Sequence, residues 1–247
     1  MTNNKKKIFI TGSSSGIGLH LAKKLSLDKK NEIIINSRNL IKLTKAKKII
    51  SDCEYIKGDV SDYKIALKIS KKIKKLDVLI CNVGNSSSSF PGKERYQDWE
   101  KSFSDNFFSS VNIIKAFEKK LIKSKGLIIC ISSICGIEYV KGAPLTYSVS
   151  KAALNAFVRF YSKILGPKGA RINAIAPGNI LFKGSVWEKK IKKNRKKTLK
   201  IINDEVSTKK IGSPENVFNT VNYLISEKTN FINGSVFIID GGQIRSL

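Results

Sequence analysis

The sequence predicts a single-domain α/β protein with a doubly wound parallel sheet of about seven strands and helices on both faces. Short, near-continuous apolar runs alternate with longer amphipathic, lysine-rich stretches, and the first run leads directly into a glycine-rich turn. Apolar strands that are each followed by a helix are typical of a parallel sheet covered on both faces. The length of 247 residues suits one large domain, 1–247, and no repeat or Pro/Gly-rich linker divides it.

The elements are expected to alternate along the chain. Strands are predicted at 7–11, 32–36, 54–57, 77–81, 127–131, 171–175 and 235–239. Amphipathic helices are predicted at 16–27, 40–50, 62–74, 107–123, 146–165 and 214–226. Two segments break the alternation: 85–97 is Ser-rich and predicts a surface loop, and 178–212 is charged and irregular. Long excursions at the carboxyl ends of strands border the ligand crevice of such a sheet, so we expect a lid-like segment near 179–212.

The composition narrows the class of protein. The chain has 46 basic against 19 acidic residues, a formal charge of +27, but only six of the basic residues are arginine. Nucleic-acid sites usually recruit arginine, and here the lysines are spread over the whole length, so we expect no nucleic-acid partner. A surface this positive would still attract phosphates or acidic carriers.

Neither a membrane span nor a secreted or metal-binding framework is expected. No apolar run approaches the roughly 18 residues that span a membrane, and the apolar stretch at 8–10 is too short for a secretory signal. The four cysteines form no CxxC pair, and the chain has one histidine, so we predict no metal site. We therefore expect a cytoplasmic protein.

The glycine-rich turn after the first apolar run is the first candidate binding element. Glycines allow a tight turn and let backbone N–H groups at a helix N-terminus approach a pyrophosphate. The alternative is a plain connection between a strand and a helix. The candidate binding residues of this turn are Gly12, Ser14, Ser15, Gly16, Ile17 and Gly18.

Together with further motifs, this turn resembles the cofactor motif of the short-chain dehydrogenase/reductase family, and the resemblance covers essentially the whole chain. The further matches are Gly58-Asp59-Val60, Asn82-Val83-Gly84, Asn106, Ser133, Tyr147-x-x-x-Lys151, Pro177-Gly178 and Asp240-Gly241-Gly242, in that order. The resemblance implies a Rossmann fold and a nicotinamide cofactor. In the short, single-domain branch it is closest in kind to 3-oxoacyl-acyl-carrier-protein reductases.

Tyr147 and Lys151 also carry a physical argument of their own. Residues at i and i+4 share one helix face, so the phenol and the ammonium point into the same cleft. A nearby cation stabilises a phenolate, so we expect Lys151 to lower the pKa of Tyr147 toward neutrality. The alternative is an ordinary pair on an amphipathic helix in a lysine-rich chain.

The resemblance assigns the other catalytic roles. Ser133, rather than Ser132, aligns with the serine that positions the substrate oxygen. Asn106 aligns with the asparagine that bends its helix and holds a water for proton relay; the alternative is a helix-capping asparagine.

The end of the second strand decides the predicted cofactor. An NAD enzyme places an acid there to bind the ribose 2′-hydroxyl, whereas an arginine accommodates a 2′-phosphate. The chain has Ser37-Arg38 and no acid at this point, which predicts NADP(H). The resemblance implies that the remaining cofactor contacts are Asp59, Val60, Asn82, Gly84, Tyr147, Lys151, Pro177, Gly178 and Ile180.

The chain departs from the family pattern at two places. Val83 stands where the family's Asn-Asn-Ala-Gly motif has alanine, and Cys81 replaces its first asparagine. Phe182 replaces a threonine that supplies a hydroxyl to the nicotinamide pocket. The segment 180–188, with Phe182 and Trp187, is interpreted as a substrate lid.

The predicted activity is hydride transfer between NADP(H) and a carbonyl or secondary alcohol, with Tyr147 as the general acid/base. The substrate is either a 3-oxoacyl chain on acyl carrier protein, near Lys125 and Lys168, or a sugar or polyol intermediate. The alternative is a non-catalytic binding or regulatory protein on the same fold. The resemblance also implies a homotetramer formed through the helices at 107–123 and 146–165 and through the last strand.

Overall fold

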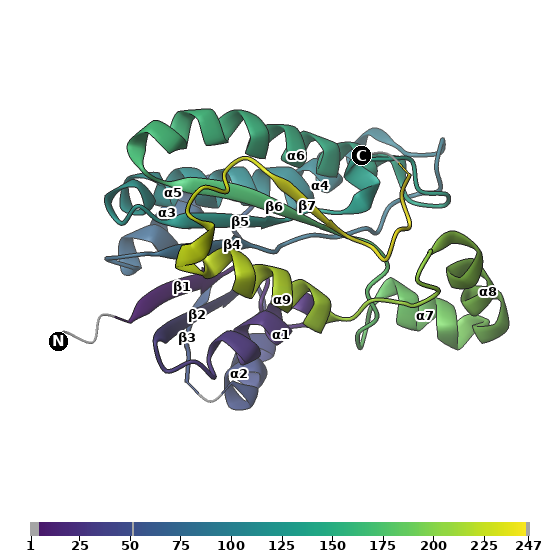
Figure 1. The fold of residues 1–247 in the computed structure, drawn as a ribbon, viewed down its shortest axis with the longest axis horizontal. Helices are drawn as coiled ribbons and strands as arrows, with labels where there is room; N and C mark the ends of the chain where they lie inside the picture. Colours follow the sequence, from purple (N-terminus) through teal and green to yellow (C-terminus); the bar gives the residue numbers. More distant parts are fainter. Residues whose placement is uncertain (1–4, 51, 246–247) are drawn as a thin grey trace.

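Seven short apolar runs form one parallel sheet in the computed structural model, which describes residues 5–50 and 52–245 (Figure 1). Every strand lies within two residues of its predicted bounds, and the predicted doubly wound fold is confirmed. The strands are β1 (Lys6–Ile10), β2 (Asn31–Ser37), β3 (Glu54–Lys57), β4 (Val78–Cys81), β5 (Leu127–Ile131), β6 (Arg171–Pro177) and β7 (Val236–Ile239).

The strand order places a switch point in the middle of the sheet. The order is β3-β2-β1-β4-β5-β6-β7, and each neighbouring pair is parallel. The chain thus winds outward from β1 to β3, returns to β4 beside β1, and winds outward again to β7. In such a sheet the connections after β1 and β4 diverge to opposite faces and leave a ligand crevice at the carboxyl edge.

Helices cover both faces of the sheet. They are α1 (Gly16–Leu25), α2 (Leu40–Ile49), α3 (Tyr63–Lys72), α4 (Tyr96–Phe103), α5 (Ser109–Lys123), α6 (Leu145–Leu165), α7 (Val186–Lys193), α8 (Arg195–Glu205) and α9 (Pro214–Ile225). Helices α1, α2 and α9 pack on one face and α3, α5 and α6 on the other, whereas α7 and α8 project at one end (Figure 1).

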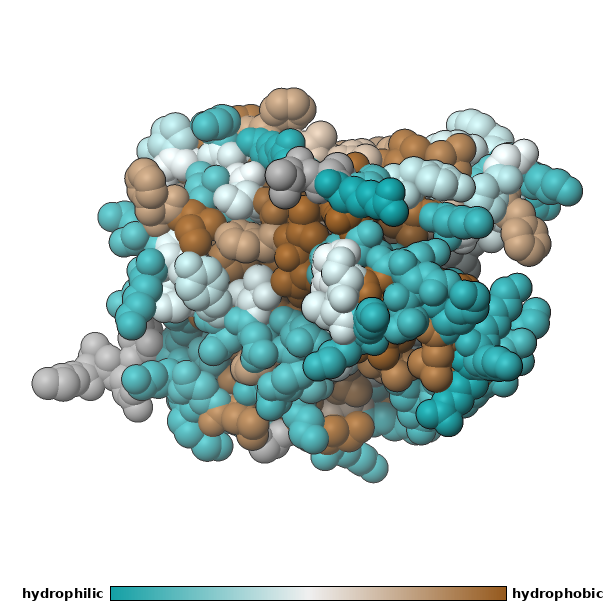
Figure 2. Space-filling view, turned by 45° about the vertical axis from the view of Figure 1, so that its right-hand side comes forward, coloured by the Kyte–Doolittle hydropathy of each residue, from teal (hydrophilic) through white to brown (hydrophobic). Residues whose placement is uncertain are grey.

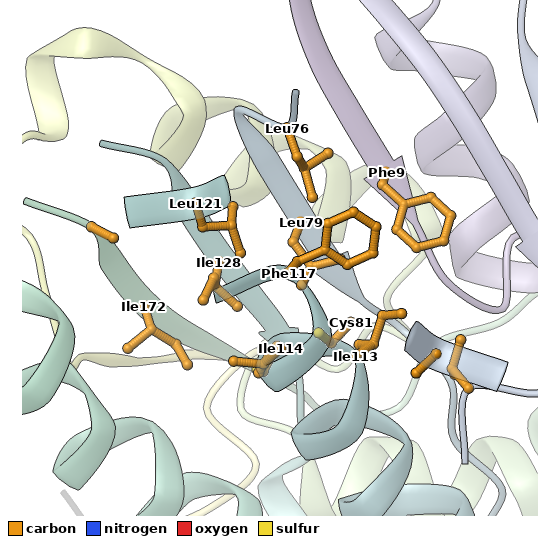
Figure 3. Close-up of a cluster of buried hydrophobic side chains, with 14 of the residues drawn as sticks. Phe9, Leu76, Leu79, Cys81, Ile113, Ile114, Phe117, Leu121, Ile128 and Ile172 are labelled. Carbon is orange, nitrogen blue, oxygen red and sulfur yellow. The ribbon is translucent and has the colours of Figure 1, made fainter. Parts of the chain in front are cut away.

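The alternation of side chains along β1 divides the core into two layers. Phe9 faces α5 and lies 5.5 Å from Phe117, ring centroid to ring centroid, within the cluster that Figure 3 shows. Ile8 and Ile10 face the opposite layer, which α1, α2 and α9 cover. Each such side chain, once fully buried, stabilises the fold by about 1.5–3 kcal/mol.

Three helices were missed by the sequence analysis. Helix α4 begins inside the predicted loop 85–97, and α7 and α8 occupy most of the segment predicted to be irregular. Side-chain caps begin the latter two: Ser185 accepts a hydrogen bond from the Glu188 amide at 3.0 Å, and Asn194 accepts one from the Lys197 amide at 2.9 Å. Both helices are short and rich in exposed lysine, so they carry too few apolar residues for the pattern on which the prediction depended.

The long helix predicted at 107–123 begins with a π-helical turn, η1 (Ser104–Phe108), that continues from α4. The Ser109 hydroxyl donates to the Asp105 carbonyl at 2.7 Å, which satisfies one carbonyl that the wider turn frees. Such insertions occur frequently at functional sites. Here the turn places Asp105 and Asn106 beside the carboxyl edge of the sheet.

The face that carries α7 and α8 is mostly hydrophilic. Figure 2 brings the side of α7 and α8 forward and shows hydrophilic residues over most of this face, with hydrophobic ones gathered near its centre. In residues 5–50 and 52–245, every helix is too short or too polar to cross a membrane.

Candidate active site

The glycine-rich turn after β1 requires glycine for two different reasons. Gly12 and Gly16 have φ values of +61° and +57°, which disfavour a side chain. A Cβ on Gly18 would lie 2.4 Å from Asn82 Nδ2 and 2.8 Å from the Gly12 carbonyl oxygen, so the helix approaches the turn too closely for any other residue. The sequence thus builds a tight bend that leads directly into α1.

The first turn of α1 leaves backbone donors for an anion. The N-cap residue Ser15 makes no side-chain capping bond, and the first helical hydrogen bond runs from the Leu19 amide to the Ser15 carbonyl at 3.2 Å. The amides that precede Leu19 therefore have no acceptor within the helix, and the helix dipole favours negative charge at this end. Gly16, Ile17 and Gly18, which are predicted to bind a cofactor, thus lie at an end of the helix that is suited to an anion.

Asn82, which follows β4, braces this turn. Its Nδ2 donates to the carbonyl oxygens of Thr11 and Gly12, both at 3.1 Å, and its amide donates to Thr11 Oγ1 at 3.0 Å. The Asn82 side chain is therefore occupied in holding the turn in shape, and the prediction of a cofactor contact at Asn82–Gly84 concerns the main chain. Only the main chain from Asn82 to Gly84 remains for a direct contact.

Ser133, Tyr147 and Lys151 come together where β5 ends. Ser133 caps a short 3-10 turn, η2 (Ile134–Gly136), by accepting a hydrogen bond from the Cys135 amide at 3.2 Å. Tyr147 and Lys151 lie one turn apart on α6, with Lys151 Nζ 5.9 Å from the centroid of the Tyr147 ring. Lys151 is only 2% exposed and donates to the Ile131 carbonyl at 2.8 Å. The ammonium is thus fixed behind the phenol, at the end of β5.

The electrostatics of this group differ from the expectation. Burial raises the pKa of the Tyr147 phenol well above its ordinary value; the Cys135 thiol adds to the rise, and a hydrogen bond from Ser133 opposes it. Burial also lowers the pKa of Lys151 to about 8, and the Cys130 thiol is the first of the groups that oppose this shift. The expected lowering of the Tyr147 pKa is therefore not met in this structure, because burial raises it and Lys151 is not among the groups that oppose the rise.

Asn106 links the π-helical turn to the loop after β4. Its Nδ2 donates to the carbonyls of Asn85 at 2.9 Å and Ser102 at 3.0 Å, and its Oδ1 accepts from the Asn85 amide at 2.8 Å. A Cβ on Gly84 would lie 3.2 Å from Asn106 Oδ1 and 3.3 Å from Lys151 Nζ. Gly84 thus lets Asn106 and Lys151 face one narrow space, and the Asn106 side chain does more than cap a helix.

The residues predicted to bind the adenosine end lie on the other side of β1. Arg38 Nη1 lies 3.7 Å from Asp59 Oδ2. Partial burial raises the pKa of Asp59, but hydrogen bonds from Ser61 and the charge of Arg38 outweigh it, and the pKa falls below its ordinary value. Ser37 accepts a hydrogen bond from the Asn39 amide at 3.3 Å. The Val60 side chain is buried in the core, so only its main chain is free to line a ligand.

The residues that lead into the 179–212 segment line the other side of the crevice. Gly178, after Pro177, donates its amide to the Ile239 carbonyl at 3.1 Å, and Ile180 forms an isolated bridge with Gly212. The Phe182 ring reaches back to the glycine-rich turn: a Cβ on Gly16 would lie 2.8 Å from its edge. Phe182 therefore covers part of the turn.

Two residues near the site were missed in the sequence. Asp105 is a buried acid beside Asn106, and Cys135 contributes to the field at Tyr147. In the sequence Asp105 stands among serines and phenylalanines just before the predicted helix 107–123, and nothing there marks it as buried. Within the described ranges, no cluster of three His, Cys, Asp and Glu residues is arranged to hold a metal ion.

A doubly wound sheet with a glycine-rich turn, a serine after β5 and a Tyr-x-x-x-Lys helix defines a nucleotide-binding type of α/β protein. A family model described as enoyl-(acyl carrier protein) reductase matches residues 12–243. The chain belongs to the short-chain dehydrogenase/reductase family of oxidoreductases.

Comparisons with individual proteins are consistent with this family assignment. The 3-oxoacyl-[acyl-carrier-protein] reductase FabG of Rickettsia conorii is 30% identical over 241 residues, 97% of either chain. Isoepoxydon dehydrogenase patN of Penicillium expansum is 35% identical over 178 residues, which cover 70% of this chain but only 65% of that relative. Among solved structures, YwfH, an NADPH-dependent reductase involved in bacilysin biosynthesis, has a TM-score of 0.89 at 27% identity, over 98% of this chain and 100% of that one.

Proposed function

We propose that this protein is an NADP(H)-dependent oxidoreductase that interconverts a carbonyl compound and a secondary alcohol, with Tyr147 as the general acid/base. The observation that carries the proposal is the placement of Ser133, Tyr147 and Lys151 in one group at the carboxyl edge, beside the switch point. A non-catalytic protein on this fold has no need of the three together.

The residues at the crevice fit a dinucleotide. The close approach at Gly18 and the unpaired amides of the first turn of α1 suit a pyrophosphate, and Arg38 is a cation suited to a 2′-phosphate. When bound, the cofactor supplies the hydride and accepts it in the reverse reaction. Gly84, Gly178 and Ile180 are the further main-chain contacts in the proposal.

Side chains of the protein itself donate and replace the proton that the reaction needs. In the reductive direction Ser133 positions the substrate oxygen and Tyr147 donates its proton to that oxygen as negative charge develops there. The raised pKa keeps the phenol protonated at neutral pH, which is the form that a general acid needs. Lys151 places a cation behind the phenol. Asn106 lines the space through which Tyr147 regains the proton that it has donated.

Two substrate classes remain in the proposal, and the structure favours a different docking surface from the one expected. Lys125 and Lys168 lie close to the first residues of β5 and β6, at the amino edge of the sheet and away from the crevice. Helices α7 and α8, which are rich in exposed lysine, instead lie beside the carboxyl edge. An acidic acyl carrier would meet these helices, whereas a sugar or polyol would need no charged surface.

The test compares Tyr147→Phe with the unaltered protein. We expect NADPH oxidation with a panel of ketones, 3-oxoacyl thioesters and keto sugars to fall by at least about 100-fold in the variant, with cofactor binding retained. A carrier-bound substrate should lose its advantage over a small thioester as salt is raised. Cofactor binding without turnover on any substrate class, together with DNA binding in a gel shift, would favour the regulatory alternative.

A further inference from the structure

One guanidinium spans the proposed adenosine end of the crevice. Arg38 follows β2, and its Nη1 lies 3.7 Å from Asp59 Oδ2, after β3, and 3.9 Å from Asp105 Oδ1, in η1. The segments after β2 and β3 lie on one side of the switch point, and η1, which follows β4 in the chain, lies on the other. Neither contact is a short, two-point ion pair, and the Arg38 side chain is mostly exposed. Arg38 is thus shared between two carboxylates rather than held firmly by one.

Asp105 is fixed independently of Arg38. Its side chain is only 10% exposed, and among the described residues it is the one acidic residue that is buried. Lys101 Nζ lies 3.3 Å from Asp105 Oδ2, and Asn85 Nδ2 donates to the same oxygen at 3.3 Å. A buried carboxylate needs such partners. Its negative charge therefore stays beside the crevice when Arg38 turns toward another anion.

We propose that Asp105 is a specificity-determining residue that competes with a cofactor's 2′-phosphate for Arg38 and so limits the preference for NADP(H) over NAD(H). The inference rests on the proposed function, because it takes Arg38 as the 2′-phosphate contact. A phosphate monoester carries a charge of about −1.5 to −2 at pH 7 and is repelled by a fixed carboxylate. The 2′-hydroxyl of NAD(H) is neutral, so the carboxylate does not repel it.

The decisive variant is Asp105→Asn, which keeps the shape and a partner for Asn85 but removes the charge. Isothermal titration calorimetry should show NADPH binding about five-fold tighter, equivalent to about 1 kcal/mol, with NADH binding changed less than about two-fold. An unchanged or smaller ratio of NADPH to NADH affinity overturns the inference. If Asp105→Asn does not fold, Asp105→Ser tests the same charge.

A matched variant controls for the general loss of one negative charge. Asp28 lies in an exposed turn before β2, at the opposite edge of the sheet, where it accepts a hydrogen bond from the Lys30 amide at 2.9 Å. Asp28→Asn should leave the affinities for NADPH and NADH unchanged. An effect equal to that of Asp105→Asn would mean that the protein's net charge explains the result, and would overturn the inference.

The pairing with Arg38 is tested separately. In an Arg38→Ala background, Asp105→Asn should improve NADPH binding by less than about two-fold, since the direct repulsion is still relieved but no guanidinium is left to share. Persistence of the full effect contradicts competition for Arg38. If the unaltered protein binds neither NADPH nor NADH, the proposed function itself fails, whereas binding of both with no response at Asp105 defeats only the inference.

Discussion

At the scale of single residues, the chemistry of Tyr147 and Lys151 is set by desolvation. The spacing in the sequence predicts that both side chains share a helix face, and the structure places them so. It does not predict how deeply they lie, because burial depends on Ile131, Gly84 and other residues far away in the chain. The pair was therefore predictable and the direction of the Tyr147 pKa shift was not.

The raised pKa of Tyr147 leads to a prediction about pH. The protonated phenol is the acid for reduction and persists up to its pKa, whereas oxidation needs the deprotonated form, which becomes populated only as pH rises toward that pKa. Steady-state rates should therefore be flat with pH for reduction around neutrality and rise with pH for oxidation. An oxidation rate that levels off near pH 7 would contradict the raised pKa.

The depressed pKa of Lys151 predicts a conflict between stability and function. In the folded state Lys151 loses its proton near pH 8, but in the unfolded chain it keeps it to higher pH, so the buried charge opposes folding below pH 8 by about 3 kcal/mol. Lys151→Met should raise the free energy of unfolding by about 2 kcal/mol at pH 7, after about 1 kcal/mol is lost with the hydrogen bond to Ile131.

Urea unfolding at several pH values measures this effect. The gain from Lys151→Met should shrink as pH rises from 8 to above 10, because the unfolded lysine also becomes neutral there. Lys163→Met, at an exposed position of the same helix, should change the unfolding free energy little at any pH. A gain independent of pH would point to packing instead of charge.

At the scale of elements, the π-helical turn η1 and the loop after β4 support each other through Asn106. Asn106→Ala would leave the Asn85 amide and carbonyl without this partner, and should lower the free energy of unfolding by about 2 kcal/mol. Asn112→Ala, which breaks a single 2.7 Å bond to the Ser61 carbonyl, should cost about half as much. Limited proteolysis should show faster cleavage within 85–95 in the first variant only.

The elements themselves were predictable in proportion to their apolar content. The strands are nearly continuous apolar runs and were all found, as were the helices that pack on the sheet. Helices α7 and α8 contribute few buried side chains, and their short, lysine-rich sequences hold few apolar residues, although Ser185 and Asn194 marked their starts. The π-helical turn was not predictable, because nothing in residues 104–108 distinguishes it from an ordinary helix.

At the scale of the whole molecule, exposed apolar side chains on the outer side of α6 predict self-association. Phe160 is 74% exposed and Ile164 is 50% exposed, one turn apart. The predicted homotetramer would bury this face. Introducing aspartate at both positions should lower the mass found by light scattering, whereas Lys163→Ala should not. A single-chain mass for the unaltered protein would remove the tetramer prediction.

The sheet order follows from general rules of chain winding, but the contacts across the crevice do not. The doubly wound order could be predicted because each of the first six strands is followed by a helix. The approach of Arg38 to Asp105, 67 positions later, and of Phe182 to Gly16 depends on how loops from different strands meet at one edge. These contacts could therefore not be predicted from the sequence.

The two tryptophans of the chain, Trp99 and Trp187, stand on α4 and α7, two of the helices that the sequence did not reveal. Helix α4 packs against α6, and Trp187 lies in the segment that follows Phe182, with the Lys190 ammonium 4.4 Å from its ring centroid. Indole emission overlaps the absorption of a reduced nicotinamide. Each of these helices therefore carries an intrinsic fluorophore. Single Trp→Phe replacements would tell which tryptophan changes its fluorescence when a ligand binds.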